Sequence, residues 1–303
     1  MGRIEEALRK LEQQRGLLRN SGGQRQTPAR TDSLPSKDFA SFSLDAVSQR
    51  VPADRAALRR WGPVSMLGDE ESVRREYGQI KRPILDAALG RSVERAPNGN
   101  VVQITSAIAG EGKSITALNL ALSAARGKDW TVLLVDADTA KPDISRALGV
   151  GQKPGLTNLI ADDKVQMSDV VWGTFVDRLY FMPAGTERGS ASELLGSRRM
   201  ARIVEILDRD MANTLVVVDS SPLLLTNESP MIAALAGQIV VVVRANSTPR
   251  MVVGEALELI DPSKPVGFVL NRLPGPELGA YATVYGEGID EETQGAVGHD
   301  VSG

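Results

Sequence analysis

Cysteine is absent from the sequence, and the only histidine, His299, lies four residues from the C-terminal end. The lack of cysteine excludes disulfides, thiolate catalysis and cysteine-ligated zinc, and it fits a reducing compartment. A serine–histidine–aspartate triad would have to recruit its histidine from a polar tail, and a zinc site built on paired histidines is impossible. The sequence therefore argues against these classes of hydrolase and zinc enzyme.

Long hydrophobic runs and an excess of basic charge are missing as well. No apolar stretch approaches the roughly 20 residues that span a bilayer, and residues 1–6 carry acids where a signal peptide would be apolar. We therefore expect a cytoplasmic chain with no transmembrane segment of its own, which a partner can recruit peripherally to the inner membrane. The net charge of −3 gives no case for nucleic-acid binding.

The chain divides by composition into four segments. Residues 1–16 carry apolar side chains at helical spacing, which predicts an amphipathic helix that is either a docking helix or a frayed end. Residues 17–69 are rich in Ser, Gly, Pro, Arg and Gln and predict a flexible linker. Residues 70–275 form the predicted folded domain, and the acidic, Gly-rich residues 276–303 form a predicted disordered tail.

The folded segment alternates between strand-like and helix-like patterns. The expected strands are 101–105, 131–135, 179–182, 214–218, 238–243 and 266–270, and the expected helices are 71–88, 115–125, 201–207 and 249–259. Pro83 should end or kink the first of these helices near Arg82. Continuous Val/Ile/Leu runs are typical of strands buried on both faces. Strands separated by helices predict an α/β fold with a mostly parallel, doubly wound sheet.

A glycine-rich loop joins the first strand to the next helix. From Ala107 it reads Ala-Ile-Ala-Gly-Glu-Gly-Lys-Ser, in which Ala107 replaces the usual first glycine. Gly110 and Gly112 let backbone N–H groups point inward, and with the following helix N-terminus these form an anion cradle. Lys113 can reach the β- and γ-phosphates, and the Ser114 hydroxyl can bind Mg²⁺. The strand–loop–helix context predicts a nucleoside-triphosphate site of the P-loop type.

Carboxylates follow two of the expected strands. Asp136 and Asp138 come directly after strand 131–135, and Asp219 follows strand 214–218. The carboxyl ends of parallel strands face the crevice where such sheets bind ligands. Each carboxylate could by itself cap a helix, but Mg²⁺ needs oxygen ligands and keeps several waters. Around one Lys-Ser loop, these carboxylates predict a magnesium site.

These motifs resemble those of the bacterial tyrosine kinases, the autokinases of capsule and exopolysaccharide synthesis. Their P-loop fold is related to that of chromosome-partitioning and division-site ATPases. The resemblance rests on the Lys-Ser loop, residues 133–138, Lys141-Pro142, 216–222, 183–185, 193–195, 240–244, 247–250 and 270–272. The amphipathic start and residues 80–83 are most similar to autokinases encoded with exosortase-linked polysaccharide systems.

The resemblance implies ATP and Mg²⁺ as cofactors and phosphoryl transfer to tyrosine as the reaction. Lys113 and the cation would offset the charge on the transferring phosphoryl group, and Asp136 or Asp138 would accept the proton of the tyrosine hydroxyl. Ser114, Asp136 and Asp219 would hold Mg²⁺. Catalysis of this kind is mainly positioning and electrostatics.

The expected ATP contacts lie along the loop and at the end of the last strand. They are Ala109, Gly110, Glu111, Gly112, Lys113, Ser114, Ile115, Asn271 and Arg272. The resemblance suggests that Asn271 contacts adenine, whereas on the sequence alone a turn residue at a strand end is an equal interpretation.

Phosphoacceptor and interface residues are sparser than in the family. Its dense C-terminal tyrosine cluster corresponds here to Tyr281 and Tyr285. Its Glu-x-x-Arg-x-x-Arg ring-interface motif corresponds to Glu76, Gln79 and Arg82, without the middle Arg. We expect Tyr281 and Tyr285 as phosphoacceptors and Glu76 and Arg82 at an oligomer interface. The alternatives are incidental tyrosines and a solvated helix face.

The resulting hypothesis is a non-specific protein-tyrosine autokinase that regulates exopolysaccharide biosynthesis and export. It would act with a membrane chain-length determinant, a Wzz-like co-polymerase, and would assemble as a homo-oligomeric ring. The alternatives are a partitioning-type ATPase switch and a nucleotide-binding scaffold without phosphotransfer. Partitioning ATPases carry a second lysine early in the loop, where this chain has Ile108, and this difference favours the kinase.

Overall fold

The computed structural model describes residues 42–53, 71–91, 95–127, 129–187, 191–209, 211 and 213–272. The predicted helix at 1–16, most of the predicted linker, and the predicted tail with Tyr281 and Tyr285 lie outside the described residues. No helix in the described part of the chain combines the length and the hydropathy needed to cross a membrane.

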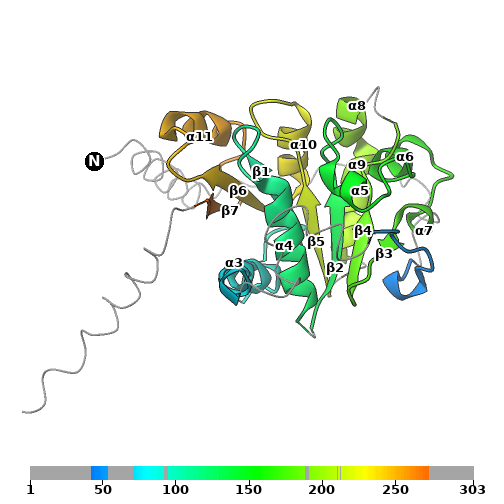
Figure 1. Cartoon of the computed structure of the whole chain (residues 1–303). Coiled ribbons are helices and arrows are strands. Elements are labelled where there is room, and N and C mark those ends of the chain that lie inside the picture. Colours follow the sequence, from blue (N-terminus) through cyan, green and yellow to red (C-terminus); the bar gives the residue numbers. More distant parts are fainter. Residues whose placement is uncertain are drawn as a thin grey trace, which may run out of the picture. The chain divides into compact units, whose positions relative to one another are not determined.

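A seven-stranded sheet in the order β3-β4-β2-β5-β1-β6-β7 forms the centre of the described domain (Figure 1). Its strands are β1 (Val101–Ser106), β2 (Thr131–Asp136), β3 (Trp172–Gly173), β4 (Leu179–Met182), β5 (Thr214–Asp219), β6 (Gln238–Arg244) and β7 (Val266–Asn271). Every neighbouring pair is parallel except β3 and β4, which are antiparallel. The predicted mostly parallel sheet is confirmed, and the long predicted strands begin at the expected residues.

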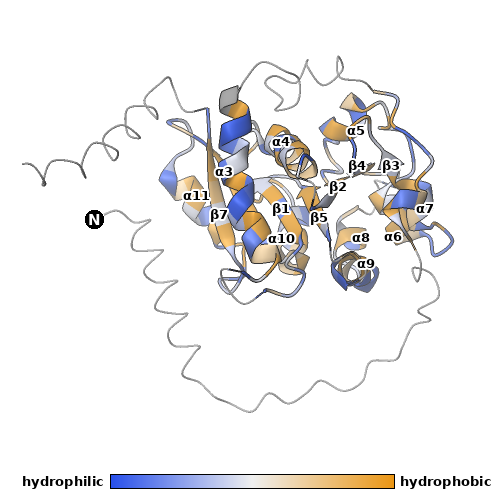
Figure 2. Ribbon diagram, turned by 90° about the horizontal axis from the view of Figure 1, so that it is seen from below, coloured by the Kyte–Doolittle hydropathy of each residue, from blue (hydrophilic) through white to orange (hydrophobic). Residues whose placement is uncertain are grey.

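Helices cover both faces of the sheet. They are α3 (Glu71–Ala88), α4 (Lys113–Ala125), α5 (Asp143–Ala147), α6 (Leu156–Ala161), α7 (Met167–Val170), α8 (Ala191–Leu195), α9 (Arg198–Arg209), α10 (Glu228–Leu235) and α11 (Arg250–Leu257). Apolar residues of α3, α4 and α5 pack on one face, and those of α6 to α11 pack on the other. Helix α4, largely orange in Figure 2, is buried from Thr116 to Ala125, because α3 packs over it.

The first predicted helix has the expected span but does not end at its proline. Helix α3 continues through Pro83 to Ala88, so the predicted end near Arg82 is wrong. The residues after the proline are held by packing, since Ile84 and Ala88 are buried in the core that α3 shares with α4. The carbonyl of Ile84 also accepts a hydrogen bond from Gln238 Nε2 at 3.0 Å. Tertiary contacts thus outweigh the backbone hydrogen bond that proline removes.

Residues 42–53 correct part of the predicted linker, because they lie against the β3 edge of the sheet. Leu44 and Val51 are buried in the core, the first of them in a short 3-10 helix at Leu44–Ala46. Arg50 bridges Gly173 in a parallel arrangement, with Gly173 N donating to Gln49 O at 2.9 Å and Val51 N donating to Gly173 O at 3.0 Å. The sequence analysis assigned this segment to the linker on its composition, and Leu44 and Val51 alone do not form a recognisable periodic pattern.

The order of the strands brings the expected site residues together. Strands β1, β5 and β2 are successive neighbours, and their C-terminal ends carry the loop at Ala107, Asp219 and Asp136. Asp136 and Asp219 are register partners across the β2–β5 pair. The sheet therefore places the predicted loop and the predicted carboxylates at the same edge.

Candidate functional site

The glycine-rich loop connects β1 to α4 in the conformation that its glycines were expected to allow. Gly110 and Gly112 have φ values of 84° and 99°, in the left-handed region. Gly112 is the N-cap of α4 and offers no side chain to the helix N-terminus. The first N–H groups of α4 are thus left without a side-chain cap, as an anion-binding helix start requires.

Gly112 is needed for a second reason, which Gly110 does not share. A Cβ on Gly112 would lie 2.0 Å from Asn271 Nδ2, whereas a Cβ on Gly110 would meet nothing within 4 Å. We predict that Gly112→Ala weakens Mg-ATP binding at least tenfold more than Gly110→Ala. Both variants strain a left-handed backbone position, but only Gly112→Ala adds a clash with Asn271. Calorimetric titration of both variants checks this, and equal losses would show that the Asn271 contact is irrelevant.

Lys113 lies among the carboxylates at the start of α4. Its Nζ is 2.6 Å from Asp138 Oδ2 and 3.8 Å from Asp219 Oδ1, and it donates to Ser114 Oγ at 3.1 Å. Burial by itself would lower the pKa of Lys113, but the negative charges of Asp219 and Asp138 outweigh it and raise that pKa above its usual range. Lys113 is therefore held as a cation at the point where phosphates would enter.

Asp136 and Asp219 are fully buried, and this burial raises both of their pKa values. The pKa of Asp136 rises to about 8, because burial is reinforced by the charge of Asp219 and only partly offset by hydrogen bonds from Ser145. Burial raises the pKa of Asp219 to about 6, and the charge of Lys113 limits the rise. Neither carboxylate oxygen of Asp219 accepts a hydrogen bond from the described residues.

This donor set fits a divalent cation. The two oxygens of Asp219 are buried acceptors whose nearby charge is Lys113 at 3.8 Å, and a hard cation would satisfy them; Asp136 adds a carboxylate one strand away. Among the described residues, no group of three acidic, histidine or cysteine side chains forms a metal site by itself. Mg²⁺ does not need one, because it binds through one or two carboxylates together with substrate phosphates and water.

Asp138 is engaged on both of its carboxylate oxygens. Its Oδ2 pairs with Lys113, while its Oδ1 accepts from Lys141 N at 3.0 Å and from Ser221 Oγ at 3.3 Å. The role of Asp138 as the acceptor of a tyrosine proton stays a prediction.

Ser145 is a functional residue that the sequence analysis missed. Its Oγ donates to Asp136 Oδ2 at 2.7 Å and its N–H donates to the same oxygen at 2.9 Å. Ser145 Oγ also accepts from Ala184 N at 3.1 Å. It thereby fixes Oδ2 of Asp136, while Oδ1 of the same carboxyl accepts from Asp138 N at 3.3 Å. No sequence signal predicted this, because α5 has only five residues.

The other expected ATP contacts are placed as follows. Asn271 Nδ2 donates to Glu111 O at 2.8 Å, so its amide lies on the glycine-rich loop. Ala109 and Gly110 are exposed at the loop tip, and Ile115 is half-buried and packs on the core. Arg272 follows Asn271 with a φ of 59°. The adenine contact of Asn271 stays a prediction, as does the role of Arg272.

The expected interface residues Glu76 and Arg82 are both exposed on α3. Exposure is what an interface between copies requires, and it is equally what a solvated helix face shows. Their role in assembly stays a prediction.

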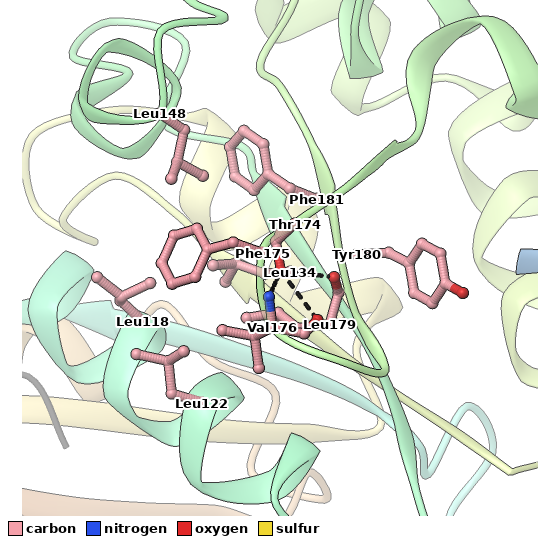
Figure 3. Close-up of a pocket in the computed structure, with 10 residues that line it drawn as sticks. All are labelled: Leu118, Leu122, Leu134, Leu148, Thr174, Phe175, Val176, Leu179, Tyr180 and Phe181. Carbon is pink, nitrogen blue, oxygen red and sulfur yellow. Dashed lines mark hydrogen bonds between the residues drawn. The ribbon is translucent and has the colours of Figure 1, made fainter. Parts of the chain in front are cut away.

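A separate pocket between α4 and the hairpin before β4 is apolar (Figure 3). It is lined by Leu118, Leu122, Leu134, Leu148, Thr174, Phe175, Val176, Leu179, Tyr180 and Phe181. Thr174 uses its hydroxyl locally, donating to Leu179 O at 2.9 Å and accepting from Val176 N at 3.0 Å. The Tyr180 hydroxyl points away from the pocket in Figure 3. The pocket therefore offers no group that would bind a phosphate.

Comparison with known proteins adds sequence relatives, although no family model matches the chain. It is similar to the tyrosine-protein kinase CpsD of Streptococcus agalactiae, with 30% identity over 57% of this chain and 75% of CpsD. It is also similar to the succinoglycan biosynthesis transport protein ExoP of Rhizobium meliloti, with 35% identity over 60% of this chain. The chain spans about a quarter of the length of ExoP (23%) and of EpsB of Ralstonia nicotianae (25%).

Solved structures show the same relationship. The VpsO kinase domain is 30% identical with a TM-score of 0.52, and the match covers 65% of this chain and 100% of that domain. The BceF tyrosine kinase domain is 25% identical with a TM-score of 0.59, and the match covers 75% of this chain and 93% of that domain.

Proposed function

Because the chain belongs to the bacterial tyrosine kinases of capsule and exopolysaccharide synthesis, we propose that it transfers the γ-phosphoryl group of ATP to tyrosine. The observation that carries this proposal is the cluster around Lys113, where the lysine of a phosphate-binding loop lies between Asp138 and Asp219. Lysine, a buried carboxylate pair and free helix N–H groups are what phosphoryl transfer needs for positioning and charge compensation.

In the proposed reaction, the phosphates bind to the N–H groups of residues 110–114 and Lys113 turns from Asp138 to the β- and γ-phosphates. Ser114, Asp136 and Asp219 would hold Mg²⁺, which when bound offsets phosphate charge. The tyrosine oxygen forms a bond to the γ-phosphorus as the bond to the β–γ bridging oxygen breaks, and ADP leaves with that electron pair. Asp138, released by Lys113, accepts the hydroxyl proton.

We assign proton transfer to Asp138 rather than to Asp136 because of their partners. Asp136 Oδ2 is fixed by two donors of Ser145, and its Oδ1 accepts from Asp138 N at 3.3 Å, so both oxygens are held by backbone and hydroxyl donors that stay in place. Asp138 Oδ2 pairs with Lys113, so this oxygen becomes available once the lysine turns to the phosphates.

The wider role follows from the family and is part of the same proposal. The chain would regulate exopolysaccharide assembly in the cytoplasm, recruited to the inner membrane by a membrane chain-length determinant. It would assemble as a ring through the exposed face of α3 that carries Glu76 and Arg82, and would be phosphorylated on Tyr281 and Tyr285 in trans. The relatives' names support the polysaccharide setting, since ExoP is named for succinoglycan biosynthesis and transport. The exosortase-linked subgroup is supported by the sequence of the N-terminal segment.

The test is phosphotyrosine mapping by mass spectrometry after incubation of the full chain with ATP and Mg²⁺. We expect phosphate on Tyr281 or Tyr285 and its loss in Ser114→Ala. We also expect ATP to be consumed only when the acceptor tyrosines are present. The double variant Tyr281→Phe/Tyr285→Phe is the matched acceptor control. ATP hydrolysis without phosphotyrosine would support the ATPase switch instead, and binding without turnover would support a scaffold.

A further inference from the structure

Glu111 is a buried acid inside the phosphate-binding loop. It is 1% exposed, and its carboxylate accepts three hydrogen bonds from the described residues. Oε2 accepts from Ile108 N at 2.9 Å, within the loop, while Oε1 accepts from Arg244 N at 3.2 Å and from Thr248 Oγ1 at 2.6 Å. Both oxygens thus accept hydrogen bonds from the protein itself, Oε2 from within the loop and Oε1 from outside it, so the Glu111 side chain is engaged in holding the protein together.

The donors outside the loop belong to the turn after β6. Arg244 is the last residue of that strand, and Thr248 lies just before Pro249, the N-cap of α11. This turn contains Ser247-Thr248-Pro249-Arg250, to which the proposed reaction gives no role. Thr248 supplies the shortest of the three hydrogen bonds to Glu111.

The same loop residue also contacts the end of the last strand. The carbonyl of Glu111 accepts from Asn271 Nδ2 at 2.8 Å, and Ala245 N donates to Asn271 O at 2.9 Å. The turn after β6 and the end of β7 are therefore joined to each other and to the phosphate-binding loop. Glu111 makes both of the connections to the loop, one through its side chain and one through its backbone.

We propose that Glu111 and Thr248 are positioning residues that hold the turn after β6 and Asn271 at a fixed distance from the phosphate-binding loop. This rests on the proposed function, in which the loop binds the phosphates, together with the predicted contact between Asn271 and adenine. A ligand that contacts both regions gains affinity when their spacing is preorganised, because no ordering has to occur on binding. A ligand that contacts only the loop gains nothing from that spacing.

The distinction can be measured with two ligands, Mg-ATP and magnesium tripolyphosphate, titrated calorimetrically into the full chain. Thr248→Val removes the hydroxyl with little change of shape and leaves the loop sequence intact. We expect it to weaken Mg-ATP binding about tenfold, as loss of a hydrogen bond to a charged group would, and to leave tripolyphosphate binding within about twofold. Thr248→Ser keeps the hydroxyl and should bind Mg-ATP within about threefold of the original chain.

A readout in turnover accompanies the binding measurement. In Thr248→Val the KM for ATP should rise by the same factor as the dissociation constant, while kcat stays within about twofold, because the reacting groups are untouched. The control is Thr131→Val. Thr131 begins β2, at the end of the strand away from Asp136, so this variant loses a threonine hydroxyl far from both the phosphate-binding loop and the turn after β6.

Each outcome decides the matter. Equal weakening of both ligands would mean that the hydrogen bond only shapes the phosphate cradle, and unchanged binding of both would mean that it positions nothing; either result overturns the inference. Failure of the unmodified chain to bind Mg-ATP more tightly than tripolyphosphate would instead overturn the proposed function, since no adenosine contact would then exist.

Discussion

Lys113→Met should destabilise the nucleotide-free chain by about 3 kcal/mol at pH 8, roughly the cost of breaking a buried ion pair. It should also lower the rate of phosphoryl transfer at least 100-fold, roughly the effect of losing a group that stabilises charge in the transition state. The Nζ of Lys113 lies 2.6 Å from Asp138 Oδ2 and 3.8 Å from Asp219 Oδ1. Without it, buried carboxylates face one another with no compensating charge. Catalysis falls because the transferring phosphoryl group loses the same positive charge.

The pH dependence of this variant identifies the cause. Losing Lys113 should raise the pKa of Asp219 further above its ordinary range, because the charge of Lys113 limits that rise in the original chain. A raised folded pKa means that stability is lost as pH rises, and the defect should therefore be larger at pH 8 than at pH 5. Urea denaturation at both values, with a chelator present, measures it.

The matched control is Lys141→Met. Lys141 Nζ lies 3.2 Å from Asp143, but its side chain is 72% exposed, and exposed pairs of this kind contribute little. We expect its midpoint of denaturation to stay close to that of the unmodified chain. A Lys113→Met chain as stable as Lys141→Met would refute the view that Lys113 compensates the buried carboxylates. Lys113→Met is also a poor inactive control on its own, because inactivity and partial unfolding would be mixed.

The sequence predicted the centre of this site because its parts are local. A Lys-Ser loop after a buried strand is recognisable within a few residues, and Asp136 and Asp219 are found by locating where apolar runs end. Parallel pairing then places these ends together, since a parallel sheet aligns its carboxyl ends. For Asn271 the sequence suggested an adenine contact or a turn residue, and its hydrogen bond to Glu111 O was not predicted.

The missed residues act across long separations in the sequence. Thr248 contacts Glu111 across 137 positions, and Ala184 N contacts Ser145 across 39. A hydroxyl leaves no periodic signal, so nothing local distinguishes these two residues from surface polar ones. Glu111 was expected only as an ATP contact, whereas its Oε1 accepts hydrogen bonds from Arg244 and Thr248 in the turn after β6. The packed segment at residues 42–53 was missed because it was assigned to the linker on composition, although Phe42, Leu44, Val47 and Val51 supply apolar side chains to the core.

The second large effect is expected for Asp136→Asn, which should make the nucleotide-free chain more stable while lowering phosphoryl transfer at least 100-fold, roughly the effect of removing a charged group from the transition state. Asp136 is fully buried beside Asp219, and burial and that neighbouring charge raise the pKa of Asp136 to about 8. An amide has no ionised form to desolvate. Its carbonyl oxygen can still accept from Ser145, so the hydrogen bonds that fix the side chain can remain.

The gain should depend on pH in a defined direction. In the unfolded chain Asp136 ionises near its ordinary value of 3.8, whereas in the folded chain it stays protonated until about pH 8. The original chain therefore loses stability as pH rises between these values, and Asp136→Asn does not lose that contribution. We expect the variant to be more stable by on the order of 2 kcal/mol at pH 8 and by little at pH 4.

Combining the two variants tests whether one cluster of charges causes both effects. If Lys113 compensates a cluster of carboxylates that includes Asp136, then removing the charge of Asp136 should reduce the loss of stability caused by Lys113→Met. The double variant should then be more stable than the sum of the separate changes by roughly 1 kcal/mol or more, as coupled neighbours are. Strict additivity in the double variant would contradict the cluster. Coupling would mean that the carboxylates which reduce the stability of the nucleotide-free fold are the same ones that bind the cation and compensate the lysine. Binding of the cation and nucleotide would then relieve the repulsion between carboxylates at the ends of β2 and β5.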